Sequence, residues 1–179
     1  EDVIAKASVA KKPEIYVIAK GLESSLIYEF VNGNRNNTVN PHFWLDPMLM
    51  KHAATNVALK LKNTFTASEK RIDENLKKFS EKMDELDRFI TKQFSNIKKR
   101  PVICLHNAFS YFAKRYEIEI AGVIEETPDL PSSPQQITKI ISIARSKKVC
   151  AVFGEIGSSG EIARRVAEEL KVPFAMIDT

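Results

Sequence analysis

The sequence predicts an α/β protein with two parallel-sheet lobes joined by one long linker helix. From Pro101 onward, short apolar runs alternate with helical stretches, which is typical of a parallel sheet. Residues 68–97 form one long amphipathic stretch, and strand and helix signals also precede it. We therefore expect residues 1–67 to belong to the first lobe, 68–97 to the linking helix and 98–179 to the second lobe. The first lobe is expected to be incomplete in this chain.

The first lobe should contain a strand, a loop and a helix. Residues 13–19 (PEIYVIA) are apolar and β-branched, which predicts a buried strand that Gly21 ends. The Asn-rich residues 32–40 predict a loop. Asp46 and Pro47 then predict a helix start, with the aspartate as N-cap and the proline at the first helical position. Apolar residues continue at helical spacing through Met50, Ala54, Val57, Ala58 and Leu61.

The long stretch from Ser68 to about Ile97 carries one apolar stripe at spacings of three, four or seven residues. A helix of that length measures roughly 45 Å, which is longer than a small domain is wide. Such a stripe is also typical of a coiled coil. Because it lies between two strand–helix units, a helix joining two lobes is the favoured interpretation and a coiled coil is the alternative.

The second lobe should alternate strictly between strands and helices. The predicted strands are residues 102–105, 118–124, 149–153 and 174–177, and the predicted helices are 108–116, 135–145 and 160–170. A proline-rich loop is expected between the second strand and the second helix.

The composition argues against a membrane-spanning protein and against a nucleic-acid-binding protein. With 179 residues, 44% of them hydrophobic, the chain can bury a core, and no apolar run reaches the roughly 18 residues of a membrane span. The net charge of +4 is spread along the chain. The densest basic cluster, residues 98–100, has no interleaved aromatic residues, which favours a solvated helix end over a nucleic-acid interface.

The ends of the sequence suggest a piece of a longer protein. The chain starts at Glu1 without a targeting segment, and it stops just after the last predicted strand. By itself, a piece that lacks about half of its first lobe is expected to bind a ligand held between the lobes only weakly.

Chemically active side chains follow three of the predicted second-lobe strands. His106, Glu155 and Asp178 stand at strand ends, and His42 occupies the equivalent loop of the first lobe. Ligands of parallel sheets gather at the carboxyl ends of the strands. Two imidazoles with one or two carboxylates suit zinc or manganese. The spacing is too wide for a local zinc finger, so such a site requires two lobes to close on it.

A structural explanation of the same residues remains open at this point. A histidine after a strand is more often a helix cap or a surface residue than a metal ligand. Asp178 could be an N-cap, and Glu155 a solvated loop acid.

Two strings carry a family resemblance. Residues 40–47 (NPHFWLDP) and 106–116 (HNAFSYFAKRY) resemble segments of the metal-binding lipoproteins that feed zinc or manganese to bacterial ABC transporters. Residues 101–109, 150–155 and 174–178 are similar to the C-terminal lobe of that family, and residues 68–97 to its lobe-linking helix. The resemblance covers nearly the whole chain.

The resemblance implies a set of site residues. His42, His106 and Asp178 match metal-ligand positions, and a further family histidine early in the first lobe has no counterpart in this chain. Glu155 matches a glutamate expected in the second shell, where it would orient a ligand. His52 matches no ligand position and is expected on a helix face. Trp44 is expected to pack near the metal loop.

The resemblance also implies the function. We expect an extracytoplasmic solute-binding protein, at the periplasmic or outer face of the cytoplasmic membrane, with no enzyme activity. It would capture zinc, with manganese as the alternative, and deliver it to an ABC permease and its ATPase. We expect a monomer that touches the membrane only through a lipid anchor or the permease, and no nucleic-acid partner.

Two other function classes are weighed against this interpretation. A zinc-dependent hydrolase with Glu155 as base would need an open coordination position, and no HExxH motif is present. A nucleotide-binding module would need a glycine-rich loop after a strand, and residues 157–160 (GSSG) fit neither known fingerprint.

The two cysteines are predicted to be buried free thiols. Cys104 lies two residues before His106, whereas Cys150 lies five before Glu155. If the two strands are neighbours aligned at these rim residues, the sulfurs are offset by about three residues, or roughly 10 Å. That distance exceeds disulfide reach.

Overall fold

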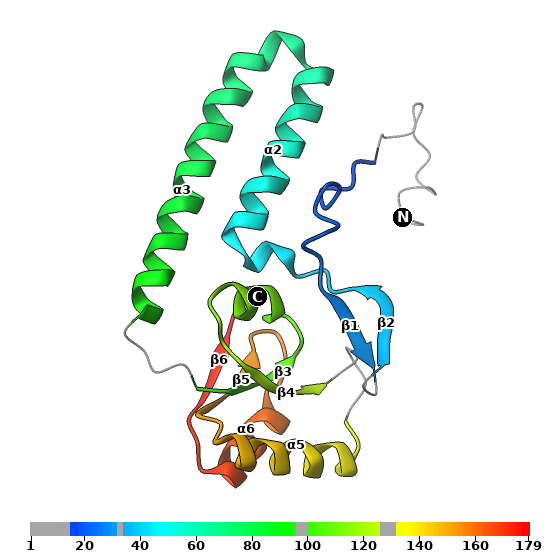
Figure 1. Cartoon of the computed structure of the whole chain (residues 1–179), viewed down its shortest axis with the longest axis vertical. Coiled ribbons are helices and arrows are strands. Elements are labelled where there is room, and N and C mark those ends of the chain that lie inside the picture. Colours follow the sequence, from blue (N-terminus) through cyan, green and yellow to red (C-terminus); the bar gives the residue numbers. More distant parts are fainter. Residues whose placement is uncertain (1–14, 32–33, 96–99, 126–131) are drawn as a thin grey trace.

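The computed structural model describes residues 15–31, 34–95, 100–125 and 132–179 (Figure 1). The part before the parallel sheet consists of the strands β1 (Tyr28–Val31) and β2 (Asn34–Val39), the short 3-10 helix η1 (Phe43–Leu45), α2 (Pro47–Thr64), a second 3-10 turn η2 (Thr66–Ser68) and α3 (Glu69–Ser95). None of the described helices is both long and apolar enough to cross a bilayer.

The prediction of a strand at residues 13–19 is wrong for residues 15–19, the part of this segment that the structure describes. Residues 15–19 form no strand, and Lys20 and Leu22 instead close turns by donating to the carbonyls of Val17 and Ala19. A strand requires a pairing neighbour, and the described part of the chain offers this segment none. Pro13 and Glu14 lie outside the described residues.

The prediction of a loop at residues 32–40 is also wrong for most of residues 34–40, the part of this segment that the structure describes. Residues 34–39 form β2, which pairs with β1 in an antiparallel hairpin. Cross-strand hydrogen bonds override the weak strand propensity of an Asn-rich segment. Within the described residues, the strands before α3 are thus antiparallel, and the parallel sheet lies in the second lobe.

The helix α2 begins as the sequence predicts. The Asp46 side chain caps it by accepting hydrogen bonds from the backbone N–H groups of Met48 at 2.8 Å and Leu49 at 3.3 Å, and Pro47 is the first helical residue. The cap residue Asp46 directly follows η1. The start of α2 therefore fixes the end of the loop that contains His42.

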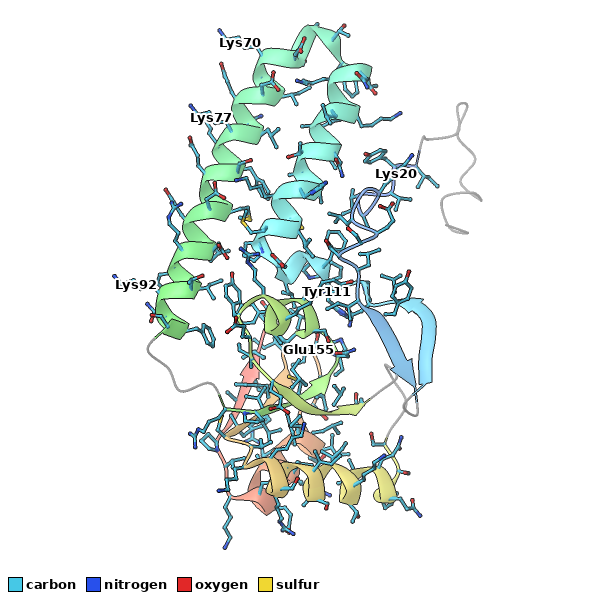
Figure 2. All side chains as sticks on the ribbon, viewed as in Figure 1. Lys20, Lys70, Lys77, Lys92, Tyr111 and Glu155 are labelled. Carbon is cyan, nitrogen blue, oxygen red and sulfur yellow. The ribbon has the colours of Figure 1, made fainter. Side chains whose placement is uncertain are left out.

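The long helix α3 runs beside α2 in an antiparallel pair and then leads into the parallel sheet (Figure 1). Its stripe residues Ile72 and Phe79 line a shallow apolar groove with Val57 of α2. Lys70 and Lys77 point away from α2 into solvent (Figure 2). The helix therefore joins the two halves and also uses its stripe to pack on α2. Ile97, the expected end, lies outside the described residues.

The second lobe is a four-stranded parallel sheet, which confirms the α/β class. Its elements are β3 (Val102–His106), α4 (Ser110–Arg115), β4 (Ile120–Glu125), α5 (Pro134–Lys147), β5 (Ala151–Glu155), α6 (Glu161–Leu170) and β6 (Phe174–Ile177). The strand order is β4-β3-β5-β6, and all pairs are parallel.

Helices cover both faces of this sheet. On one face, α5 and α6 bury Ile103, Leu105 and Val152 in the main core. The other face meets α4 and the end of α3, where Phe94, Phe112 and other apolar side chains enclose a cavity of about 570 Å³. Figure 1 shows α5 and α6 together below the strands and α4 above them.

The cysteines are free and offset as expected. Cys104 pairs in register with Phe153, three residues after Cys150, so the two sulfurs cannot bond. Burial raises the pKa of the Cys104 thiol to about 12. The prediction of burial is wrong for Cys150, which is half-buried because it lies just before β5 at the edge of the core.

Candidate metal centre

The carboxyl edge of the parallel sheet carries the three side chains that the sequence places there. His106 is the last residue of β3, Glu155 is the last of β5, and Asp178 directly follows β6. The strand β5 lies between β3 and β6, so the three positions share one rim. The expected rim placement is therefore confirmed.

His42 meets this rim from the first lobe. It is the N-cap residue of η1, between β2 and α2. Its Nε2 atom lies 3.2 Å from Nε2 of His106, although 64 residues separate the two in sequence. The ring centroids are 4.9 Å apart and the ring planes make an angle of 62°. The Trp44 ring lies 5.1 Å from the His42 ring, beside this loop as expected.

Hydrogen-bond partners fix the tautomer of each imidazole. Nδ1 of His106 contacts the Glu155 carboxylate, which only accepts. Nδ1 of His42 lies 2.9 Å from Oδ1 of Asn40. That amide cannot be reversed, because its Oδ1 also accepts the His42 backbone N–H at 3.0 Å while its Nδ2 donates to the Asn107 carbonyl at 2.5 Å. In both rings Nδ1 is therefore the donor.

The two Nε2 lone pairs consequently point at each other. Two such lone pairs repel at 3.2 Å unless a cation, either a proton or a metal ion, lies between them. Burial, and next the neighbouring His106, lower the pKa of His42, which favours its neutral, metal-binding form. In a tetrahedral zinc site with Zn–N bonds of about 2.0–2.1 Å, two ligand nitrogens are roughly 3.3–3.4 Å apart. The donor pair thus fits a divalent transition metal.

Asp178 does not join this cluster in the structure. Its carboxylate accepts the backbone N–H of Thr179 at 3.1 Å, and the residue lines the edge of the 570 Å³ cavity. Across the described ranges, no three His, Cys, Asp or Glu side chains form a metal-binding group. Glu155 is held instead by His106 and by the Thr179 hydroxyl, which donates to it at 2.5 Å. The role of Asp178 as a ligand stays a prediction.

The remaining histidine lies elsewhere. His52 is exposed on α2, as expected for a helix-face residue.

Two residues near the site escaped the sequence reasoning. Asn40 is fully buried, with 0% of its surface exposed, and Tyr111 of α4 is 2% exposed. The Tyr111 hydroxyl donates to the Asn40 carbonyl at 2.8 Å and accepts from the Ile27 N–H at 2.9 Å. Figure 2 shows Tyr111 where α2, α4 and the β1–β2 hairpin meet. An asparagine directly before Pro41 in an otherwise loop-like segment was the available signal.

Comparison with known proteins identifies the family. The family model "ZnuA: Zinc-uptake complex component A periplasmic" matches residues 1–179, the whole chain. The chain belongs to the ZnuA family.

Curated ZnuA-family relatives match over most of the chain. The "High-affinity zinc uptake system protein ZnuA" of Brucella abortus is 28% identical over 137 residues, which cover 76% of this chain and 41% of that protein. The "Manganese ABC transporter substrate-binding lipoprotein PsaA" of Streptococcus anginosus is 25% identical over 180 residues, which cover 99% of this chain and 57% of that protein. The chain thus spans about half the length of these relatives.

Solved structures show the same fold. A crystal structure of ZnuA aligns with a TM-score of 0.76 at 23% identity, covering 90% of this chain and 60% of the other. The AdcAII protein of Streptococcus pneumoniae aligns with a TM-score of 0.74 at 26% identity, covering 92% and 60%. A Zn(II)-bound AdcAII variant also aligns at 0.74, with 25% identity, covering 90% and 59%.

Proposed function

We propose that this chain is part of an extracytoplasmic solute-binding protein that captures a divalent transition metal between two lobes. The observation that carries the proposal is the pair of converging Nε2 atoms of His42 and His106, 3.2 Å apart, each with its other ring nitrogen held by an acceptor. We propose these two residues and Asp178 as ligands, with Glu155 orienting His106 from the second shell. Family membership supports binding rather than catalysis.

The proposed partners and location follow from the relatives. One relative is named a substrate-binding lipoprotein of a manganese ABC transporter, and the family description contains the word periplasmic. We propose that the whole protein works outside the cytoplasmic membrane as a monomer and hands its metal to an ABC permease driven by an ATPase. It would contact the membrane only through a lipid anchor or through the permease. The hydrolase alternative gains no support, because the family is a zinc-uptake component.

Zinc titration of two histidine variants tests the proposal. We expect His106→Ala to weaken zinc binding by at least 100-fold, because it removes a nitrogen donor from a small ligand set. His52→Ala is the matched control, since it removes an exposed histidine of α2 and should leave the Kd unchanged. Isothermal titration and the zinc-induced rise in Tm report the result. An undiminished rise in Tm for His106→Ala would refute the assignment.

We further propose zinc rather than manganese as the metal carried. Imidazole nitrogens favour a borderline-soft tetrahedral ion, whereas manganese prefers more oxygen ligands and higher coordination. Zinc outcompetes manganese at most nitrogen sites, so affinity alone does not decide the physiological metal. We expect a strain lacking the gene to regain growth in metal-limited medium on zinc. Rescue by manganese alone would overturn the zinc assignment and leave the binding function intact.

A further inference from the structure

Asn40 contacts both the second lobe and the His42 imidazole. It comes from the first lobe, and all of its polar groups are engaged although none of its surface is exposed. Its amide donates to the carbonyl of Asn107, the residue after His106, at 2.5 Å. Its own carbonyl accepts from Tyr111 of the second lobe at 2.8 Å.

The same side chain also sets the chemistry of His42. Its Oδ1 accepts the backbone N–H of His42 at 3.0 Å and faces the ring Nδ1 at 2.9 Å. A hydrogen on Nδ1 leaves the lone pair on Nε2, the atom that faces His106. The His42 backbone N–H and the Asn107 carbonyl together fix the direction of the Asn40 amide. The second lobe therefore helps to set the tautomer of a first-lobe histidine.

We propose that Asn40 is a positioning residue that holds His42 in its metal-binding tautomer and fixes its distance from His106. This inference rests on the proposed metal-binding function of the site. Residues that hold the second nitrogen of a ligating histidine affect metal affinity by about 10- to 100-fold in other metalloproteins. Asn40 differs from such a partner in also bonding to the opposite lobe. The contact between the lobes therefore supports the metal-binding tautomer.

Three variants separate positioning from simple structural support. Asn40→Ala removes all side-chain contacts. Asn40→Asp keeps both acceptor contacts to His42 and loses the donor to Asn107. Tyr111→Phe is the control, because it removes a neighbouring lobe contact without touching the His42 ring.

The first readout needs no metal. Long-range ¹H–¹⁵N spectra at pH 8 report which ring nitrogen of a histidine carries hydrogen, and the chain has three histidines to assign. We expect His42 in the Nδ1–H form in the unaltered chain, in Asn40→Asp and in Tyr111→Phe. In Asn40→Ala we expect a shift towards the Nε2–H form that an unconstrained imidazole favours.

The second readout is the Kd for ZnCl₂. We expect a 10- to 100-fold increase for Asn40→Ala, a smaller increase for Asn40→Asp, and a change within about threefold for Tyr111→Phe despite a lower Tm. The proposal is overturned if His42 has the Nε2–H form in the unaltered chain, or if Tyr111→Phe weakens zinc binding as much as Asn40→Ala. If Asn40→Ala does not fold, the Kd values of Asn40→Asp and Tyr111→Phe are compared instead. The proposal then requires Asn40→Asp to bind zinc more weakly than Tyr111→Phe does. An unaltered chain that binds no zinc but shows the Nδ1–H form would refute the proposed function alone.

Discussion

At the scale of single residues, the site depends on acceptors placed behind each histidine. Glu155 holds Nδ1 of His106, and Asn40 holds Nδ1 of His42. Both partners orient a ring so that Nε2 faces the opposite lobe. A metal site of this kind needs its supporting side chains as well as its ligands.

Removing the carboxylate behind His106 should weaken metal binding. We expect Glu155→Ala to raise the Kd for zinc by about 10- to 100-fold, because the His106 ring loses the group that orients it. Glu155→Gln should have a smaller effect, since its amide oxygen can still accept from Nδ1. Competition with a chromophoric chelator measures the Kd, and Glu168→Ala on the exposed side of α6 is the control. Wild-type affinity in Glu155→Ala would contradict this role.

The sequence indicated the rim positions of His106 and Glu155, but it did not indicate that Asn40 supports His42. The rim residues follow strands whose apolar runs are visible locally, so His106 and Glu155 could be placed in advance. The hydrogen bonds of Asn40 span 67 residues to Asn107 and 71 to Tyr111. No local pattern reports contacts between lobes, which arise only when the chain folds.

At the scale of elements, the helices were predicted better than the first-lobe strands. Helix starts are encoded locally, as at Asp46 and Pro47, where cap and proline stand side by side. Strands need partners distant in sequence. The β-branched run at residues 15–19 forms no strand, whereas the Asn-rich residues 34–39 form one because β1 pairs with them.

Helix α3 is tied to α4 by a charged cluster near the site. The Asp87 carboxylate accepts from Nε of Arg115 at 2.7 Å and from the Tyr116 hydroxyl at 3.0 Å. The same guanidinium lies 3.6 Å from Asp46, the cap of α2. Arg115 therefore connects three helices, and its hydrogen bond is the main reason why the pKa of Asp87 lies below its usual range.

This cluster predicts a pH-dependent loss of stability. Asp87 has a lower pKa in the folded than in the unfolded chain, where it is about 3.9, so its contribution is present above that value and is lost as pH falls through the folded pKa. We expect Asp87→Asn to lower the free energy of unfolding by about 1–2 kcal/mol at pH 7. The difference from the unaltered chain should disappear once the pH has fallen below the folded pKa of Asp87.

Urea unfolding at several pH values measures this difference. Glu74→Gln, an exposed acid on the same helix, controls for the loss of one negative charge. A difference between Asp87→Asn and the unaltered chain that stays constant from pH 7 to pH 2 would show that Asp87 acts through packing and not through its charge.

At the scale of the whole molecule, the fold brings one histidine from each side of the lobe boundary to a single point. The α2–α3 hairpin leads the chain away from His42 and back to the parallel sheet, whose strand β3 ends at His106 (Figure 1). Hydrogen bonds from Asn40 and Tyr111 already cross the boundary near the site. Metal capture should therefore involve small local adjustments rather than a wide opening of the lobes.

The location of zinc in a crystal of the chain tests the central claim most directly. An anomalous difference map collected at the zinc absorption edge shows where the bound ion lies. We predict one strong peak between His42 and His106, at about 2.0–2.1 Å from both Nε2 atoms. The account would be contradicted if the zinc ion were bound elsewhere and the two Nε2 atoms contacted each other without a metal ion between them.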